Sequence, residues 1–420
     1  MHVALITQDF PPSAYGGIAS SCFDLANSLV SEGVEVDVFS GRRYASSKQL
    51  DKFFSTIGHG LSQTRGSKFE SLAQLNNGLR ITWLPKYVSA PRLSLVVNSS
   101  ALVSCVAKAK VDVVHAFGPY GLLIDLIKKR TNKPVLSNIH GVPHRVFSTF
   151  IHSPLSTWSL GDFASDFLEY PVSSMLMKTT LRESDHVVFP SLNCLADTLS
   201  SYRLSLNKVS VIINGIDFGA PYFRNLTNES EKNSPSIVYC GRLAWIKGIV
   251  PMIQAFSILV KKFPNSTLKI IGGGPLMSHA RTLVSNLGLQ KRVNFLGALP
   301  REKAVQELRN AAFLALPSLN ENCPVVVCEA MSLAKPVVAF DFPFARALIV
   351  DNHNGLLARP VDVRDFSDKM LSLLNDEDLR ERLGKNAYLY AKEKFDWSKN
   401  VKEYIKIYMK LASGKRSREN

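Results

Sequence analysis

Several features that would decide a protein's class are missing from this sequence. No apolar run approaches about eighteen residues, so no segment is predicted to span a membrane as a helix. The opening stretch, MHVALITQDF, has no charged region ahead of an apolar one, so no secretory signal is predicted. The six cysteines form no C-x-x-C pair, which argues against a structural zinc site and is typical of reduced cytosolic thiols. We therefore expect a cytoplasmic protein that binds no metal.

Acidic residues are scarce relative to basic ones. The chain has 35 Asp and Glu against 50 Lys and Arg, a formal net charge of +15, and the excess is greatest over residues 41–70 and after residue 399. Such a balance favours polyanions: nucleic acid, phosphorylated substrates or an anionic membrane face. A solvated surface with a frayed tail would give the same pattern. No recognised nucleic-acid module is present, so we expect no nucleic-acid partner.

Strand and helix patterns alternate along most of the 420 residues. An unbroken apolar run at the start predicts a strand buried on both faces of a parallel sheet, and a Gly/Pro-rich loop and a helical pattern over 18–31 follow. After a polar stretch that ends near residue 235 the alternation restarts. The sequence therefore predicts an α/β fold of two doubly wound, Rossmann-like domains facing across a cleft.

The predicted domain boundaries follow from this alternation. The segment over 141–170 breaks it with aromatic residues among serines and prolines, which is typical of either an acceptor lid or an inserted loop. The boundaries are residues 1–215 for the first domain, 216–235 for the linker, 236–395 for the second domain, 396–412 for a helix packing back toward the first domain, and 413–420 for a basic tail.

Two glutamates lie eight positions apart in the second domain. Glu321 falls in the loop after a predicted strand, and Glu329 falls in the first turn of the next helix. Both carboxylates can then face one ligand at the mouth of the sheet, where a carboxylate accepts paired hydrogen bonds from a sugar diol. The alternative for Glu329 is that it merely complements the helix dipole.

Two cations follow another predicted strand of the same domain. Arg242 and Lys247 lie five residues apart in a turn flanked by glycines, which suits a diphosphate because a planar fork and a point charge can grip it together. Strand ends also carry Arg and Lys for solubility alone. The pattern by itself is therefore a weak signal.

Glycine loops and one histidine complete the candidate set. Gly16 and Gly17 precede a helix, and Gly273 lies in a second glycine-rich loop, so backbone N–H groups can approach a phosphate there. Neither loop has the G-x-G-x-x-G pattern, and a glycine pair is often only a turn. His140 ends a predicted strand at the same sheet edge as Gly17, although a histidine in such a place is often structural.

In their order, these motifs resemble one family. The resemblance covers nearly the whole chain and is strongest over residues 237–357, so spacing, order and residue type agree. The chain is identified as a member of the GT-B glycosyltransferases of family 4. The motifs are the Gly-Gly loop, His140-Gly, Asn214-Gly-Ile-Asp217, G-R-L-x-x-x-K-G, G-G-G-P, F-L-G and P-S-x-x-E-x7-E-A-M.

The resemblance implies a function and a role for each motif. Family members move a sugar from a nucleotide-sugar donor to an acceptor hydroxyl with retention at the anomeric carbon and without a bound metal or other cofactor. The first domain then serves the acceptor and the second the donor. The implied roles are the donor diphosphate for Arg242 and Lys247, the ribose for Glu329, the transferred sugar for Glu321, sugar and phosphate for the amides of Asn322, Cys323, Val325 and Val326 together with Gly273, the β-phosphate for Gly16 and Gly17, and the reaction centre for His140.

Two positions depart from the family pattern. Pro324 stands where many members carry a glycine, so an amide contact is lost, and Ala347 stands where a glutamate is usual. These departures are the only support for an alternative, a catalytically silent nucleotide-sugar-binding protein. A third reading, a sugar-nucleotide epimerase on a related fold, is disfavoured by the motif order.

The acceptor is less defined than the donor. We expect a glycolipid, a lipid-linked oligosaccharide or a polysaccharide precursor, because basic surfaces would hold the protein at the inner face of an anionic membrane. A soluble acceptor is the open alternative. The last predicted helix has a lysine face opposite its apolar face, which suits either packing alone or such a contact.

Overall fold

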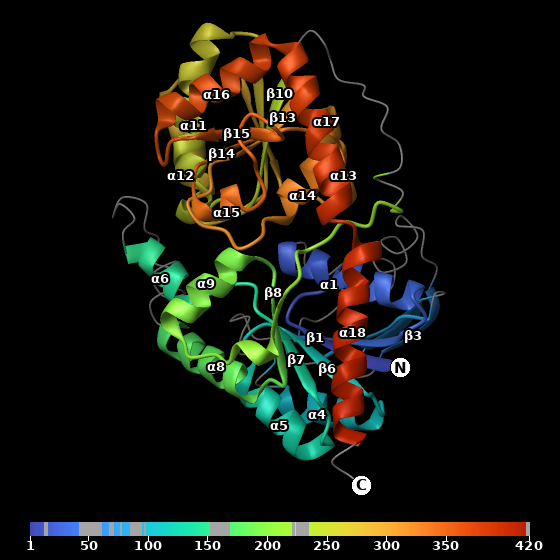
Figure 1. The fold of residues 1–420 in the computed structure, drawn as a ribbon. Coiled ribbons are helices and arrows are strands. Elements are labelled where there is room, and N and C mark those ends of the chain that lie inside the picture. Colours follow the sequence, from blue (N-terminus) through green and yellow to red (C-terminus); the bar gives the residue numbers. More distant parts are fainter. Residues whose placement is uncertain are drawn as a thin grey trace. The chain divides into compact units, whose positions relative to one another are not determined.

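The computed structural model describes residues 1–11, 16–41, 61–66, 71–75, 78–84, 95, 98–151, 169–220, 223 and 235–416. The chain divides into two compact units. The first unit comprises residues 1–143, 171–221 and 396–420, and the second comprises residues 144–170 and 222–395. Each is an α/β unit built on one sheet (Figure 1). Residues 42–60 and 67–70 of the basic stretch lie outside the described part of the chain. Residues 152–168 of the segment predicted as a lid or an inserted loop also lie outside it.

The sheet of the first unit has nine strands in the order β3-β4-β5-β2-β1-β6-β7-β8-β9. The strands β2, β1, β6, β7, β8 and β9 are parallel neighbours in this order. Apolar residues bury β1 and β6 on both faces, whereas the edge strand β9 is half-buried. The bounds are β1 His2–Thr7, β2 Glu35–Ser40, β3 Leu61–Gly66, β4 Ser71–Leu75, β5 Arg80–Trp83, β6 Val113–Phe117, β7 Val135–Asn138, β8 His186–Phe189 and β9 Val209–Val211.

One edge of this sheet is an antiparallel hairpin, which the doubly wound fold predicted from the sequence did not include. Strand β4 pairs antiparallel with both β3 and β5, while β5 pairs parallel with β2. The cause is connection length: only a few residues separate β3 from β4 and β4 from β5, too few for the crossover that parallel strands need.

Helices cover both faces of the first sheet. They are α1 Gly17–Ser31, α4 Ser99–Lys108, α5 Gly121–Thr131, α8 Glu169–Glu183, α9 Leu192–Ser201 and α18 Trp397–Arg416. Helix α6, Pro143–Ile151, follows β7, and a short 3-10 turn, Leu206–Lys208, precedes β9.

Helix α18, the last of the chain, packs on the first unit against α1 and β6 (Figure 1). Its apolar and aromatic side chains are buried, and two of them carry hydroxyls that meet buried polar groups of the sheet. Tyr408 contacts His115 Nδ1 at 2.7 Å, and Asn138 donates to the Tyr404 hydroxyl at 2.8 Å. These bonds satisfy polar atoms that would otherwise be costly to bury. They therefore fix the position of α18 on the sheet.

The sheet of the second unit has six parallel strands in the order β12-β11-β10-β13-β14-β15. Numbered within the unit this order is 3-2-1-4-5-6, the doubly wound arrangement. The strands are β10 Ser236–Cys240, β11 Thr267–Ile271, β12 Val293–Gly297, β13 Phe313–Leu316, β14 Val337–Phe340 and β15 Gly355–Ala358. The helices are α11 Ile249–Lys262, α12 Met277–Asn286, α13 Arg301–Asn310, α14 Val325–Ser332, α15 Pro343–Arg346, α16 Val363–Asn375 and α17 Glu377–Lys394.

Candidate active site

The second sheet reverses its winding between β10 and β13. These two strands are neighbours in the sheet, although β11 and β12 come between them in the chain. Ligands of doubly wound sheets bind at the carboxyl ends of the strands at this switch point. Arg242 follows β10 by two residues, and Glu321 lies in the loop after β13. Both predicted motifs of the second domain therefore meet at the position that the topology favours.

Lys247 and Glu321 are in direct contact. The Lys247 ammonium lies 2.6 Å from Glu321 Oε1, and the Ser318 hydroxyl donates to the same oxygen at 2.9 Å. Only 28% of the lysine side chain and 13% of the glutamate side chain are exposed. Among the residues that the structure describes, no side chain donates to Oε2. That oxygen keeps its capacity to accept a hydrogen bond from a ligand.

Backbone contacts hold these two loops together. The Leu319 N–H donates to the Ile246 carbonyl at 2.8 Å. Gly248 has φ +70°, and a Cβ there would lie 1.9 Å from the Pro317 carbonyl oxygen. Glycine is therefore required at 248, because any side chain would separate the loop that carries Lys247 from the loop that carries Glu321.

The glycine-rich loop after β11 packs directly on the Arg242 loop. A Cβ at Gly272 would lie 2.0 Å from the Gly241 carbonyl oxygen, and one at Gly274 would lie 2.5 Å from the Leu243 carbonyl oxygen. Gly273, the predicted binding glycine, has nothing within 4 Å of such a Cβ, and its carbonyl accepts the Leu243 N–H at 2.9 Å. Its two neighbours are thus needed for packing, whereas Gly273 borders open space.

Glu329 is buried, and it is paired. The Arg301 Nε donates to Glu329 Oε1 at 2.7 Å, and the two side chains are 10% and 9% exposed. The negative charge of Glu329, after burial, helps to raise the pKa of the Cys240 thiol to about 12, which places that carboxylate near the end of β10. The pairing compensates the burial of a charge that would otherwise be expensive. Helix α14 begins at Val325, so Glu329 lies beyond the first turn, which corrects the expectation that it falls in that turn.

Helix α14 begins beside these groups with weak capping. Its N-cap is Pro324, and no side chain caps the first turn, so the amides of Val325 and Val326 open the helix. Early N–H groups of a helix have no partner within it and favour anions. Asn322 is half-buried and Cys323 is buried just before this turn.

Arg242 is exposed, and its backbone is anchored. Its carbonyl accepts the buried Tyr239 hydroxyl at 3.0 Å. Burial, with the Glu321 charge as a second cause, raises the pKa of Tyr239 well above its usual range, so Tyr239 stays a neutral donor. The strand thus fixes where the Arg242 loop begins.

The remaining candidates belong to the first unit. Gly16 caps α1 in an extended conformation, and both Gly16 and Gly17 are exposed. His140 follows β7 and stacks on Phe117, with ring centroids 5.5 Å apart and an interplanar angle of 14°. Burial lowers the pKa of His140 to about 4, so its ring is neutral at physiological pH.

Two site residues were missed from the sequence. Ser318 follows Pro317 in the recognised motif, so the motif itself offers a hydroxyl donor three residues before Glu321. Arg301 lies 28 positions from its partner and carries no local signal. Among the described residues, no group of three or more His, Cys, Asp and Glu could hold a metal ion.

Comparison with known families matches both halves of the chain. Residues 15–219 match the model of Glycosyltransferase Family 4, and residues 225–390 match the model of Glycosyl transferases group 1. An uncharacterized glycosyltransferase of Methanocaldococcus jannaschii is 24% identical over 97% of this chain and 98% of its own length. A D-inositol 3-phosphate glycosyltransferase of Corynebacterium efficiens is 29% identical over 51% of this chain and 54% of its own length.

Solved structures share the fold. The sucrose-phosphate synthase of Thermosynechococcus elongatus superposes with a TM-score of 0.75 at 20% identity, covering 98% of this chain and 99% of that one. Anabaena HepE, solved in complex with UDP and glucose, gives a TM-score of 0.70 at 16% identity over 96% and 98% of the two chains.

Fold and site together define a GT-B glycosyltransferase, an enzyme that acts on nucleotide-sugar donors. The chain belongs to glycosyltransferase family 4. The predicted fold class and family are thus confirmed. The roles assigned to individual site residues stay predictions.

Proposed function

We propose that this enzyme transfers a hexose, with retention and without a metal, from a nucleoside diphosphate sugar to a hydroxyl of a glycan or lipid-linked acceptor. The observation that carries the proposal is the Lys247–Glu321 pair at the switch point of the second sheet, with Glu329 near the same strand end. The cation there matches the negative charge of a diphosphate. The two carboxylates can accept hydrogen bonds from the hydroxyls of the two sugars.

Each group has a distinct task in this proposal. Lys247 leaves part of its contact with Glu321 and, with Arg242, holds the diphosphate, while the helix-opening amides of α14 face the same anion. The free Oε2 of Glu321 accepts a hydroxyl of the transferred sugar, and Glu329, held by Arg301, accepts the ribose diol. Negative charge grows on the departing diphosphate during transfer, so preorganised donors aimed at it lower the barrier.

His140 and the acceptor proton complete the reaction. His140 is neutral because its pKa is lowered to about 4, so it can donate or accept a hydrogen bond near the anomeric carbon without adding charge. The acceptor proton passes to an oxygen of the departing phosphate. No separate carboxylate base is then required.

A donor screen tests the proposal. Nucleoside diphosphate sugars are supplied with and without crude lipid extract, and release of the nucleoside diphosphate is scored. Lys247→Ala should lower turnover by about 10²–10³-fold. The matched control is Lys269→Ala, since Lys269 is 26% exposed and pairs with Glu307 at 2.8 Å in the same unit.

The outcomes separate the candidate functions. Donor-dependent release in the wild type that is lost in Lys247→Ala and kept in Lys269→Ala supports the proposal. Donor binding without release supports the silent binding protein instead. Inversion at the product's anomeric carbon, read by NMR, contradicts retention, and loss of activity in EDTA that Mg²⁺ restores contradicts metal independence.

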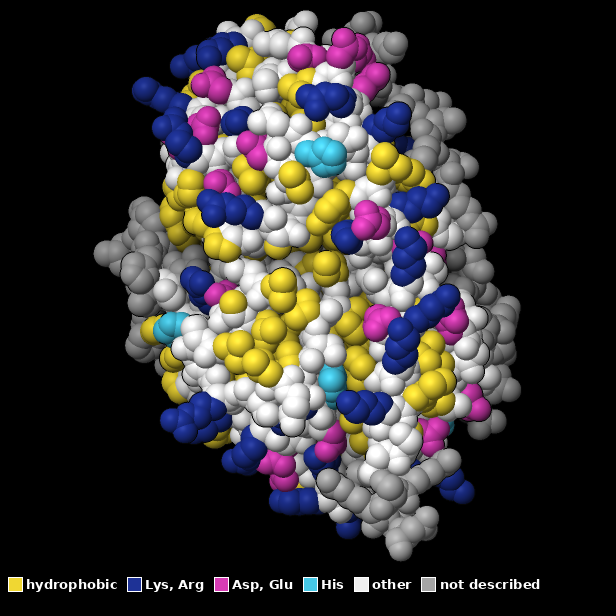
Figure 2. Space-filling model, in the orientation of Figure 1, with side chains coloured by type: hydrophobic (Ala, Val, Ile, Leu, Met, Phe, Trp, Pro, Cys, Tyr) yellow, Lys and Arg dark blue, Asp and Glu magenta, His cyan; other side chains and the backbone are white. Residues whose placement is uncertain are grey.

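We also propose that the enzyme works at an anionic membrane face. No helix in the described ranges is long and apolar enough to cross a bilayer. Helix α18 exposes Lys399, Lys402, Lys406 and Lys410, and Figure 2 shows dark blue Lys and Arg side chains over this part of the first unit. Sedimentation with anionic vesicles should fall as salt rises, and no sedimentation at low salt contradicts the proposal.

A further inference from the structure

A pocket of about 440 Å³ lies at the amino edge of the first sheet. It is lined where β8 and β9 begin and where α5, α8 and α18 end. His140 follows the opposite, carboxyl end of the neighbouring parallel strand β7. A four-residue strand is roughly 13 Å long, so this pocket is separate from the edge that carries His140.

Four cations line the pocket, against two acids. Lys128 pairs with Asp185 at 2.9 Å, and Arg182 pairs with Glu183 at 2.6 Å. Lys208 and Lys410 are the two cations left over. The lining therefore keeps a positive excess of two charges.

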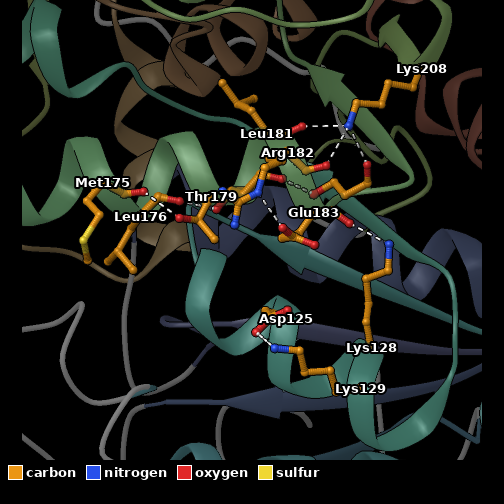
Figure 3. A network of polar contacts seen from close by, with 12 residues as sticks. Asp125, Lys128, Lys129, Met175, Leu176, Thr179, Leu181, Arg182, Glu183 and Lys208 are labelled. Atoms are coloured by element: carbon orange, nitrogen blue, oxygen red, sulfur yellow. Dashed lines mark hydrogen bonds and ion pairs between the residues drawn. The ribbon is translucent and has the colours of Figure 1, made fainter.

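Two of the lysines also build the pocket wall (Figure 3). Lys208 Nζ donates to the carbonyls of Leu181, Arg182 and Ser184 at 2.7, 3.1 and 2.9 Å, and Lys128 Nζ donates to the Glu183 carbonyl at 2.8 Å. These bonds satisfy the last carbonyls of α8, as cations do at helix C-termini. All three ammonium hydrogens of Lys208 are donated to these carbonyls, so Lys208 acts on the pocket only through its charge.

Other donors at the rim remain available. Among the described residues, no side chain is bonded to the exposed Lys410 ammonium, and the Asn207 amide nitrogen is likewise not engaged, because Ser205 contacts only its Oδ1, at 2.8 Å. Lys128 keeps one hydrogen beyond its two bonds. A tetrahedral anion with several oxygens can accept from all three groups.

The pKa shifts of two wall residues agree with an excess of positive charge in the pocket. Burial and then the charge of Lys128 lower the pKa of Lys208, although Asp185 and Glu183 partly oppose this. Burial, Lys410 and Lys208 lower the pKa of His186, whose Nε2 contacts the Ser210 hydroxyl at 2.9 Å. The cations repel one another here. An anion in the pocket would relieve that repulsion.

We propose that this pocket binds a phosphate group, presented either by a small phosphorylated molecule or by a phospholipid headgroup. The volume accommodates a phosphate with an attached moiety, since small-molecule sites span about 300–1,000 Å³. The site needs no donor sugar, so it stands independently of the transfer reaction.

The test is a phosphate titration of the full chain. The background is Arg242→Ala with Lys247→Ala, which removes the cations proposed to hold the donor diphosphate. Inorganic phosphate is titrated at constant ionic strength, with chloride as the balancing anion, and thermal stabilisation is recorded. Lys410→Gln should weaken phosphate binding about tenfold.

Lys402→Gln is the matched control, because it removes the same charge from an exposed position of the same helix outside the pocket lining. Asn207→Ala, which removes a neutral donor, provides a second variant and should weaken binding less than Lys410→Gln. Equal losses in Lys410→Gln and Lys402→Gln would mean general charge attraction and would overturn the proposal.

Vesicle sedimentation distinguishes the two sources of phosphate. Vesicles of equal parts phosphatidylcholine and phosphatidylglycerol are compared with phosphatidylcholine alone. Binding to the mixed vesicles that falls more in Lys410→Gln than in Lys402→Gln indicates a lipid headgroup, because Lys402 contributes only general charge attraction. Phosphate binding with the same variant pattern but without vesicle binding indicates a soluble ligand, and absence of the pattern in both assays overturns the site.

Discussion

The parallel strands of the two sheets are wound in the same order from the switch point, and the sheets differ in the groups at their carboxyl edges. In the second unit the switch point holds ion-paired charge: Lys247 with Glu321, and Arg301 with Glu329. In the first unit the corresponding edge holds the neutral ring of His140 stacked on Phe117. The same fold therefore supports different chemistry in the two units. In the proposed function the charged edge holds the diphosphate, and the acceptor hydroxyl needs only neutral hydrogen-bonding groups.

The largest effect should come from breaking the buried ion pair of the second unit. Arg301→Gln leaves the Glu329 carboxylate buried without its partner, so stability should fall by about 3–5 kcal/mol. Urea unfolding measures this loss. Adding Glu329→Gln should restore most of it, because the uncompensated charge is then gone. If the unfolding free energy of Arg301→Gln alone lies within about 0.5 kcal/mol of wild type, the ion pair does not stabilise the protein.

Adjacent glycines of the second unit should differ sharply. Gly274→Ala introduces a side chain at φ +154° against the Leu243 carbonyl, so backbone strain of roughly 1–3 kcal/mol is joined by displacement of the Arg242 loop. Gly273→Ala meets open space and should stay within about 0.5 kcal/mol of wild type. Thermal unfolding and donor affinity of both variants check this, and equal behaviour would contradict the packing account.

In the first unit, the bond between α18 and the sheet should carry a smaller energy. Tyr408→Phe leaves the buried His115 Nδ1 without its hydroxyl partner, a cost of about 1–3 kcal/mol. Combining it with His115→Phe should recover part of the loss in a double-mutant cycle. Tyr390→Phe is the control, since its hydroxyl makes only a 3.5 Å contact. An additive double variant would show that the two groups do not interact.

The smallest effect is a gradual dependence of stability on pH. Burial lowers the pKa of His115 to about 3 and that of His140 to about 4, below the ordinary value of 6.5. The unfolded chain therefore binds protons first as pH falls, so stability from these groups is present above pH 6.5 and is lost as pH falls toward 4. His140→Gln should flatten part of this slope in urea unfolding. An unchanged slope would mean that His140 titrates normally.

Much of the architecture could be predicted from the sequence, because buried parallel strands appear as apolar runs that turns interrupt. The helices α16 and α17 were missed, although α16 buries Phe366, Met370 and Leu373 at helical spacing. The hairpin edge β3-β4-β5 was missed because its strands are short and β3 is mostly polar. The domain boundaries stay predictions, although α18 groups with the first unit.

The site was predicted to the extent that its residues are local in sequence. Lys247 and Glu321 stand in recognisable motifs, and the fold brings them within 2.6 Å. Arg301 could not be found, because its meeting with Glu329 depends on how α13 packs against α14. The glycine loop was recognised, but only the packing shows that Gly272 and Gly274 are the constrained positions.

The proposed function depends above all on Lys247 holding the donor diphosphate. Equilibrium binding of UDP, GDP and ADP to the wild type, Lys247→Ala and Lys269→Ala tests it most directly. One nucleotide should bind the wild type and Lys269→Ala alike, and Lys247→Ala about tenfold to a hundredfold more weakly, as expected for a lost hydrogen bond between charged groups. Undiminished binding to Lys247→Ala would contradict the claim.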